Sequence, residues 1–176
     1  MFRLTKSTRL SEFERKVLPH LDAAYNLARF LMRNDQDAED VVQEASLRAF
    51  RFFDGFRGDN SRAWFLSIVR NTAFTVFKRN RSDEANVVFD EELHGGASPA
   101  LDAGVALDQA HDRETVRAAI EELPAEFREA ITLRELEGCS YKEIADIAGV
   151  PIGTIMSRLA RARRQLQMIL SRSYPK

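Results

Sequence analysis

The chain has 176 residues, which is enough for one ordinary domain or two small ones. Hydrophobic residues make up 44% of it, yet no apolar run approaches the roughly 20 residues that a membrane-spanning helix needs. The N-terminal stretch lacks the continuous apolar centre of a signal peptide, so we expect a cytoplasmic protein without membrane insertion. A single cysteine, Cys139, excludes an intramolecular disulfide, and three scattered histidines argue against a metal site; we expect no cofactor.

The net charge of −1 conceals a strong segregation of charge along the chain. Residues 1–82 carry a net charge of +5, residues 83–130 carry −10, and residues 131–176 carry +4. Two basic ends around an acidic middle suggest two surfaces for a polyanion, which the acidic segment would hold apart. Ordinary solvated surface charge would explain the same pattern equally well.

The first part of the chain shows the periodicity of two buried helix faces. Leu18, Leu21, Tyr25 and Ala28 recur at three- and four-residue steps, and Asn34 then supplies a break and a helix N-cap. The helix that follows is expected to turn its small apolar residues inward, and these are Ala38, Val41, Val42, Ala45 and Ala49. Its acidic residues then face mostly outward.

Beyond these helices the pattern divides the chain into two domains. The glycine-containing stretch 52–60 is typical of a loop, and residues 61–79 form a third helix that is apolar on most of its circumference. Periodicity fades over residues 81–112, which carry a net charge of −7 and indicate a flexible linker with a short helix near its end. Helical periodicity returns over residues 113–172, where Pro124 is expected at a first helical position. Since strand-like alternation is absent from the sequence, we predict an all-α fold of two small helical domains, 10–80 and 113–172, joined by the acidic linker.

A helix-turn-helix is predicted within the second domain, over residues 138–167. Ser140 can cap a short helix, and the apolar residues that follow it at i, i+3, i+4 and i+7 bury one face. Gly149 can adopt the left-handed conformation of a tight reversal, and Pro151 then sets the start of the next helix.

The second helix of this motif combines an apolar stripe with a polar, basic face. The stripe consists of Ile152, Ile155, Leu159, Ala162 and Leu166. Opposite it lie Ser157, Arg161 and Arg164, with Thr154 and Arg158 on the flanks. Short hydroxyl side chains followed by arginines suit a helix in the major groove of DNA. The alternative is a basic, solvated face on an ordinary core helix.

Residues 113–170, and above all YKEIADIAGVPIGTIMSRLARAR, resemble the C-terminal domain of extracytoplasmic-function sigma factors. The resemblance implies that residues 152–164 read the −35 promoter element. The residues it assigns to that element are Ser140, Tyr141, Lys142, Thr154, Ser157, Arg158, Arg161 and Arg164. Response-regulator output domains contain a similar helix-turn-helix.

The stretch DAEDVVQEASLRAF, residues 37–50, resembles the sigma-factor segment that docks on the clamp helices of the largest polymerase subunit. The implied polymerase-binding residues are Asp37, Asp40, Gln43, Glu44 and Arg48. Such an acidic, amide-bearing face suits a basic partner. By composition alone, the stretch could equally be an ordinary exposed helix face.

The stretch SRAWFLSIVRNTAFTVFKR, residues 61–79, resembles the segment that melts and binds the −10 element. The implied contacts are Asn60, Ser61, Arg62, Arg70, Asn71, Phe74, Lys78 and Arg79. Aromatic, amide and cationic side chains together suit unstacked bases and a single-stranded backbone. Trp64 and Phe65 fit a structural role in the core at least as well. Thr75 departs from the family, which often has an acidic residue there.

Taken together, the resemblances imply a sigma factor that binds core RNA polymerase, through the clamp helices and the flap of the second large subunit, and directs it to promoter DNA. They also imply control by an anti-sigma factor in a stress or envelope response, and no enzymatic activity. Three alternatives remain: a classical regulator with a sensory domain in residues 10–80, an accessory polymerase-binding protein, and an enzyme whose only candidate thiol nucleophile is Cys139. Cys139 as a redox switch is a further hypothesis.

Overall fold

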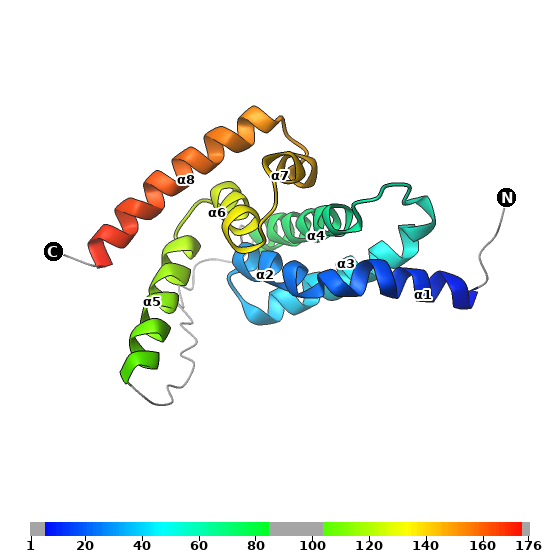
Figure 1. Cartoon of the computed structure of the whole chain (residues 1–176), viewed down its shortest axis with the longest axis horizontal. Helices are drawn as coiled ribbons and strands as arrows, with labels where there is room; N and C mark the ends of the chain where they lie inside the picture. The colour runs from blue at the N-terminus through cyan, green and yellow to red at the C-terminus, as the bar shows by residue number, and fades with distance from the viewer. Residues whose placement is uncertain (1–5, 85–103, 174–176) are drawn as a thin grey trace.

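The computed structural model describes residues 6–84 and 104–173, and within these ranges it is helical and contains no strand. The helices are α1 (Lys6–Val17), α2 (Leu21–Met32), α3 (Asp35–Phe52), α4 (Ser61–Glu84), α5 (Gly104–Glu121), α6 (Ala125–Ile131), α7 (Tyr141–Ala148) and α8 (Ile152–Ser173) (Figure 1). Short 3₁₀ turns follow α1 and α3, and a π-helical segment, Thr132–Leu136, continues α6. The all-α fold expected from the sequence is confirmed.

The junction between α2 and α3 follows the local signals at Asn34. Arg33 ends α2 in the left-handed region, with a φ of 62°, and the Asn34 side chain accepts a hydrogen bond from the Asp37 backbone N–H at 3.0 Å. This capping stabilises the helix by about 1 kcal/mol. Four of the five residues expected to face inward are buried: Ala38, Val41, Ala45 and Ala49. Because most of these side chains are small, α3 packs closely on α2 and α4.

Aromatic rings hold the loop between α3 and α4 in place. The Phe13 ring lies 5.1 Å from Phe50 and 5.5 Å from Phe53, while Phe56 lies 4.8 Å from Trp64, all between ring centroids. Phe65 is fully buried. Phe65 is therefore a core residue, and Trp64 is half-buried and packs against the core. Both have the structural role that was the alternative to DNA contact, and they hold the start of α4 in place.

The helix-turn-helix forms as its sequence predicts. Ser140 and Glu143 make a reciprocal capping box at the start of α7, with hydrogen bonds of 2.8 and 3.1 Å. Gly149 then reverses the chain with a φ of 66°. Pro124 does not take the first helical position that was expected, because its ψ of 146° is extended; it is the N-cap of α6 instead. Its carbonyl accepts hydrogen bonds from the backbone N–H groups of Phe127 and Arg128, both at 2.9 Å.

Substitution of Gly149 by alanine should destabilise the protein by about 1 kcal/mol, because a β-carbon disfavours the left-handed conformation. Its effect is conformational, since a Cβ at this position would meet no atom within 4 Å. Gly153, in the first turn of α8, is the matched control: a Cβ there also meets nothing within 4 Å, and alanine favours a helix. Thermal unfolding should therefore show a lower Tm for Gly149→Ala and an unchanged or higher Tm for Gly153→Ala. Equal Tm values would contradict the assigned backbone geometry.

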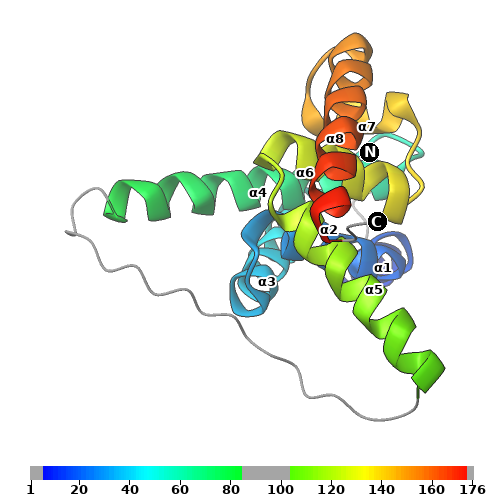
Figure 2. The ribbon, with the colours of Figure 1, turned by 90° about the vertical axis from the view of Figure 1, so that its left-hand side faces the viewer.

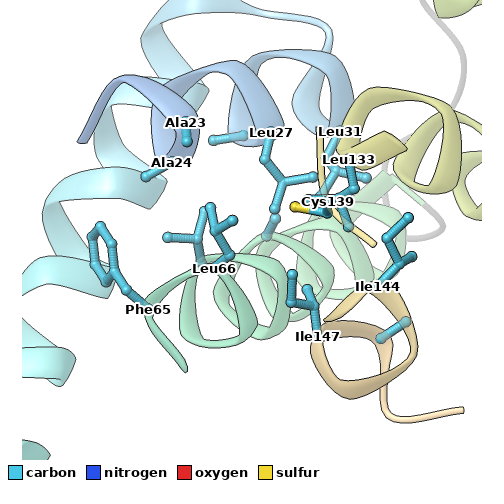
Figure 3. Close-up of a cluster of buried hydrophobic side chains, with 14 of the residues drawn as sticks. Ala23, Ala24, Leu27, Leu31, Phe65, Leu66, Leu133, Cys139, Ile144 and Ile147 are labelled. Carbon is cyan, nitrogen blue, oxygen red and sulfur yellow. The ribbon is translucent and has the colours of Figure 1, made fainter. Parts of the chain in front are cut away.

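The two halves of the chain pack against each other and share one core. Helix α4 contacts α7, and α2 contacts α6. Leu27 and Leu31 of α2 and Leu66 of α4 gather with Leu133, Cys139 and Ile144 of the second half (Figure 3). Helices from the first and the second half of the chain thus bury a single apolar cluster between them. Figure 2 shows α4 and α5 extending from this packed centre in different directions.

Both helices that border the predicted linker are longer than expected. Helix α4 continues past residue 79 to Glu84, because residues 80–84 contain no glycine or proline to end it, and α5 begins at Gly104 rather than at residue 113. The segment between them, 85–103, lies outside the described residues. The predicted domain limits stay a prediction.

Candidate nucleic-acid and polymerase interfaces

Helix α8 lies along the upper edge of the structure in Figure 1, and the basic residues on one of its faces are exposed. Ser157, Arg161 and Arg164 are exposed, and Ile155, Leu159 and Ala162 opposite them are buried. The helix is thereby held by its apolar side, and the guanidinium groups of Arg161 and Arg164 face outward. The Ser157 hydroxyl donates to the Thr154 carbonyl within the helix, at 2.9 Å. Ile152 departs from the expected apolar stripe, since it is 50% exposed. It is the first residue of α8.

The remaining residues assigned to the −35 element are less uniformly exposed. Lys142 is exposed, Ser140 serves as the cap of α7, and the Tyr141 ring lies beneath the Arg134 guanidinium at 5.0 Å. Thr154 is half-buried. Arg158 is largely covered, since only 14% of its side chain is accessible, and it pairs with Glu126 at 3.3 Å. We call the eight assigned residues the −35 group.

The residues assigned to the −10 element, here called the −10 group, divide into two sets on α4 and the loop before it. Asn71, Lys78 and Arg79 are exposed. Phe74 is half-buried beneath the Arg70 guanidinium, 4.4 Å from the ring centroid. The other set faces the second half of the chain and contacts its carboxylates. It consists of Asn60, Arg62 and Arg70, and Ser61 lies beside them with its hydroxyl 3.5 Å from His20 Nε2.

A buried carboxylate, Glu129, receives the strongest of these contacts. Arg70 Nε donates to Glu129 Oε1 at 2.7 Å, and Glu129 is 1% exposed. Burial raises the pKa of the Glu129 carboxyl, while the neighbouring Arg70 opposes that rise. A buried charge of this kind requires a partner, because leaving it unpaired would cost several kcal/mol, about 3–5. Sequence periodicity did not reveal Glu129, because the arginine that pairs with it lies 59 positions earlier.

The predicted polymerase-binding residues line an exposed face of α3. Asp40, Gln43 and Glu44 are exposed, Asp37 is half-buried, and Arg48 donates to Glu44 at 2.7 Å. Leu47 lies on the same face and is 57% exposed. The sequence analysis did not identify Leu47 as a candidate contact residue. Its position away from the inward stripe of Ala45 and Ala49 could have indicated that this leucine is exposed. We call the surface formed by Asp40, Gln43, Glu44 and Leu47 the α3 face.

The candidate thiol and the potential metal ligands can be located within the described residues. No group of three potential His, Cys, Asp or Glu ligands occurs within 6–84 and 104–173. Cys139 is 1% exposed, and burial raises the pKa of its thiol, which disfavours the reactive thiolate. It packs in the shared core, in agreement with a structural role. None of the helices in these ranges is long and apolar enough to cross a membrane.

An exposed basic helix on a helix-turn-helix, combined with a second helical unit carrying aromatic and cationic side chains, defines a DNA-binding transcription protein. Comparison with known proteins makes the class specific. Residues 17–82 match the family model of sigma-70 region 2, and residues 113–166 match that of sigma-70 region 4.

Known relatives and solved structures agree with these matches. The chain is 40% identical over 137 residues to the ECF RNA polymerase sigma-E factor of Escherichia coli K12, covering 74% of this chain and 72% of that protein. It is 33% identical to the RNA polymerase sigma-H factor of Pseudomonas aeruginosa, over 90% of this chain and 86% of the relative. The sigma factor RpoE from Bartonella quintana, solved in complex with the anti-sigma factor NepR, has a TM-score of 0.70 and 33% identity, covering 91% and 97% of the two chains. CnrH, solved with the cytosolic domain of CnrY, shares the fold with a TM-score of 0.64 at 24% identity, covering 92% and 89%.

The chain therefore belongs to the extracytoplasmic-function sigma factors of the sigma-70 family. As a sigma factor it binds core RNA polymerase and directs it to promoter DNA. The classical regulator with a sensory N-terminal domain is excluded, since residues 17–82 match sigma-70 region 2 instead.

Proposed function

We propose that this sigma factor docks on the clamp helices of the largest polymerase subunit through its α3 face. Asp40, Gln43 and Glu44 supply acidic and amide groups that complement a basic coiled coil, and Leu47 supplies apolar area at the C-terminal end of this face. The exposure of this face in a folded chain is the observation that supports the assignment. The second domain would contact the flap of the other large subunit.

Promoter reading in this proposal is divided between two helices. Ser157, Arg161 and Arg164 on α8 enter the major groove at the −35 element, where an arginine can bond guanine in a bidentate manner. Helix α4 contacts the melted −10 element through its aromatic and cationic side chains. The protein itself catalyses no reaction: it supplies binding free energy for recognition and melting, and the polymerase forms the bonds.

We propose further that the protein acts in the cytoplasm, in a stress or envelope response. An anti-sigma factor controls its activity there. Two observations support such control. The structurally similar RpoE and CnrH chains were solved with an anti-sigma factor and with the cytosolic domain of CnrY, respectively. On α8, the partly exposed side chains of Leu166 and Leu170 offer apolar area for a partner helix.

Run-off transcription tests the proposed function directly. Genomic DNA fragments transcribed by core polymerase with this protein, and not by core polymerase alone, would identify its promoter. We then expect a discrete run-off product from that promoter only when the protein is added. Properly folded protein that gave no stimulation over core polymerase would refute the proposal.

A further inference from the structure

One face of α1 lies against the end of α3 and the loop that follows it. Arg9, Phe13 and Lys16 occupy positions i, i+4 and i+7 of the helix, so they share this face. The Phe13 ring lies 5.5 Å from the Phe53 ring in an edge-to-face arrangement, and the Lys16 ammonium lies 5.5 Å from the centre of the Phe56 ring. These three side chains hold α1 and the loop together, and we call them the α1 brace.

The guanidinium of Arg9 makes four contacts where α3 gives way to the loop. Its Nη2 atom donates to the backbone carbonyls of Phe50 and Arg51 in the last turn of α3, at 2.7 and 3.4 Å. Its Nε atom lies 3.0 Å from Asp54 Oδ1, and its central carbon lies 4.7 Å from the centre of the Phe50 ring. The Asp54 side chain is 64% exposed, so the ion pair alone would contribute little. The role of Arg9 therefore depends on its forked geometry, which a lysine ammonium cannot reproduce.

The loop connects this anchor to the first residues of the −10 group. It covers residues 53–60 and ends at Asn60, whose side-chain oxygen accepts a hydrogen bond from the Ala63 backbone N–H at 2.9 Å. The Phe56 ring lies 4.8 Å from the Trp64 ring of α4. The exposed stretch just before Asn60 is thus fixed from one side by α4 and from the other by α1. Selective binding requires contact groups to be held to within about 0.5 Å, so both anchors bear on which base fits beside Asn60.

The α1 brace comes from a part of the chain that the family model does not cover. Arg9, Phe13 and Lys16 all precede residue 17, where the match to sigma-70 region 2 begins. The loop that they contact, residues 53–60, lies inside that match, which extends to residue 82. All the contacts of the brace are made within the first half of the chain, so they involve no residue of the helix-turn-helix domain.

We propose that the α1 brace positions the loop 53–60 for base selection at the −10 element, and that Arg9 is the positioning residue in it. Arg9 does not itself contact DNA, because only 26% of its side chain is accessible and its guanidinium is committed to α3 and Asp54. It acts through the loop: without Arg9 the start of the loop is released, and bases other than the preferred one fit beside Asn60. This inference rests on the proposed function, in which α4 and the loop before it contact the melted −10 element.

The test compares Arg9→Ala with Arg15→Ala, a matched control on the same helix. Arg15 carries the same charge, but its side chain is 72% exposed and its partner Glu12 is 3.9 Å away on α1 itself. Each full-length variant is assembled with core polymerase. The probes are fluorescent single-stranded oligonucleotides with the −10 sequence of the promoter that run-off transcription identifies, and versions with one base changed. The measured quantity is the discrimination ratio, the affinity for the original sequence divided by that for a changed one.

We expect Arg9→Ala to lower the discrimination ratio about fivefold at one or two positions of the −10 element, the lower end of coupling between two sites. Arg15→Ala should match wild type. A purely structural role for Arg9 would lower the Tm, or the affinity for every oligonucleotide by the same factor, and would leave the ratio unchanged. Arg9→Lys should restore the ratio only in part, since lysine keeps the charge beside Asp54 but loses the fork.

A double-mutant cycle tests the route through the loop. Asp54→Asn removes the partner of Arg9 on the loop and should also lower the ratio, while Arg9→Ala/Asp54→Asn should lower it no further than Arg9→Ala alone. Losses that multiply in the double variant would contradict this route. If circular dichroism shows that Arg9→Ala is unfolded, Arg9→Lys and Asp54→Asn carry the same comparison.

The inference and the proposed function fail in different ways. Discrimination ratios equal to wild type in Arg9→Ala and Asp54→Asn, with wild-type protein stimulating run-off transcription, would overturn the positioning role alone. Absence of stimulation by folded wild-type protein would refute the proposed function itself.

Discussion

Replacement of Arg161 by alanine should lower promoter-directed run-off transcription by roughly 5- to 150-fold while leaving binding to core polymerase unchanged. Arg161 is exposed on the outward face of α8, so its truncation leaves no cavity. A good arginine contact with a base contributes about 1–3 kcal/mol of discrimination, which converts to that range of affinity. The loss should be greatest on the cognate −35 sequence.

The control for this prediction is Arg163→Ala, two positions along the same helix. Arg163 is a surface arginine that pairs with Glu135 at 2.7 Å, an exposed ion pair of the kind that contributes little, about 0–1 kcal/mol. It should therefore reduce transcription only slightly. Core binding, measured by fluorescence anisotropy, is the second readout. Equal loss of core binding and transcription in Arg161→Ala would mean that the helix is structural and would contradict its assignment to DNA.

Replacement of Leu47 by alanine should weaken binding to core polymerase by about tenfold, since complete burial of a leucine side chain contributes about 1.5–3 kcal/mol. Leu47 is 57% exposed in the free protein, so its loss should leave the Tm unchanged. A core residue would behave in the opposite way, with a lower Tm from the cavity left behind. The pair of readouts therefore separates an interface role from a structural one.

A matched control for Leu47 is Leu18→Ala. Leu18 is also an exposed leucine of the first domain, at 47%, but it lies in the turn before α2 rather than on the α3 face. Its truncation removes a similar apolar area, and we expect no change in core binding. A loss of core binding equal to that of Leu47→Ala would show that general surface hydrophobicity, and not the α3 face, determines the affinity.

The local chain signals predicted the helix-turn-helix and the helix junctions well. Ser140 caps α7, Gly149 reverses the chain, and Asn34 caps α3, because each of these effects depends on residues within one turn of the helix. The apolar period likewise identified the inward faces of α3 and α8. The prediction for Pro124 was wrong by one position, because the fixed φ of proline is compatible with both the N-cap and the first helical position.

The class of protein, the helical elements and the residues with the chemistry to contact DNA could all be predicted from the sequence. Tertiary structure alone decided which of those residues are available. Arg70 and Arg161 are both arginines on predicted DNA-binding helices, yet Arg70 is paired with a buried carboxylate and Arg161 is exposed. Periodicity shows which face of a helix is apolar, but it cannot show which distant element covers the other faces. That choice depends on the tertiary packing, which here places Arg70 of α4 against Glu129 of α6, 59 positions later in the chain.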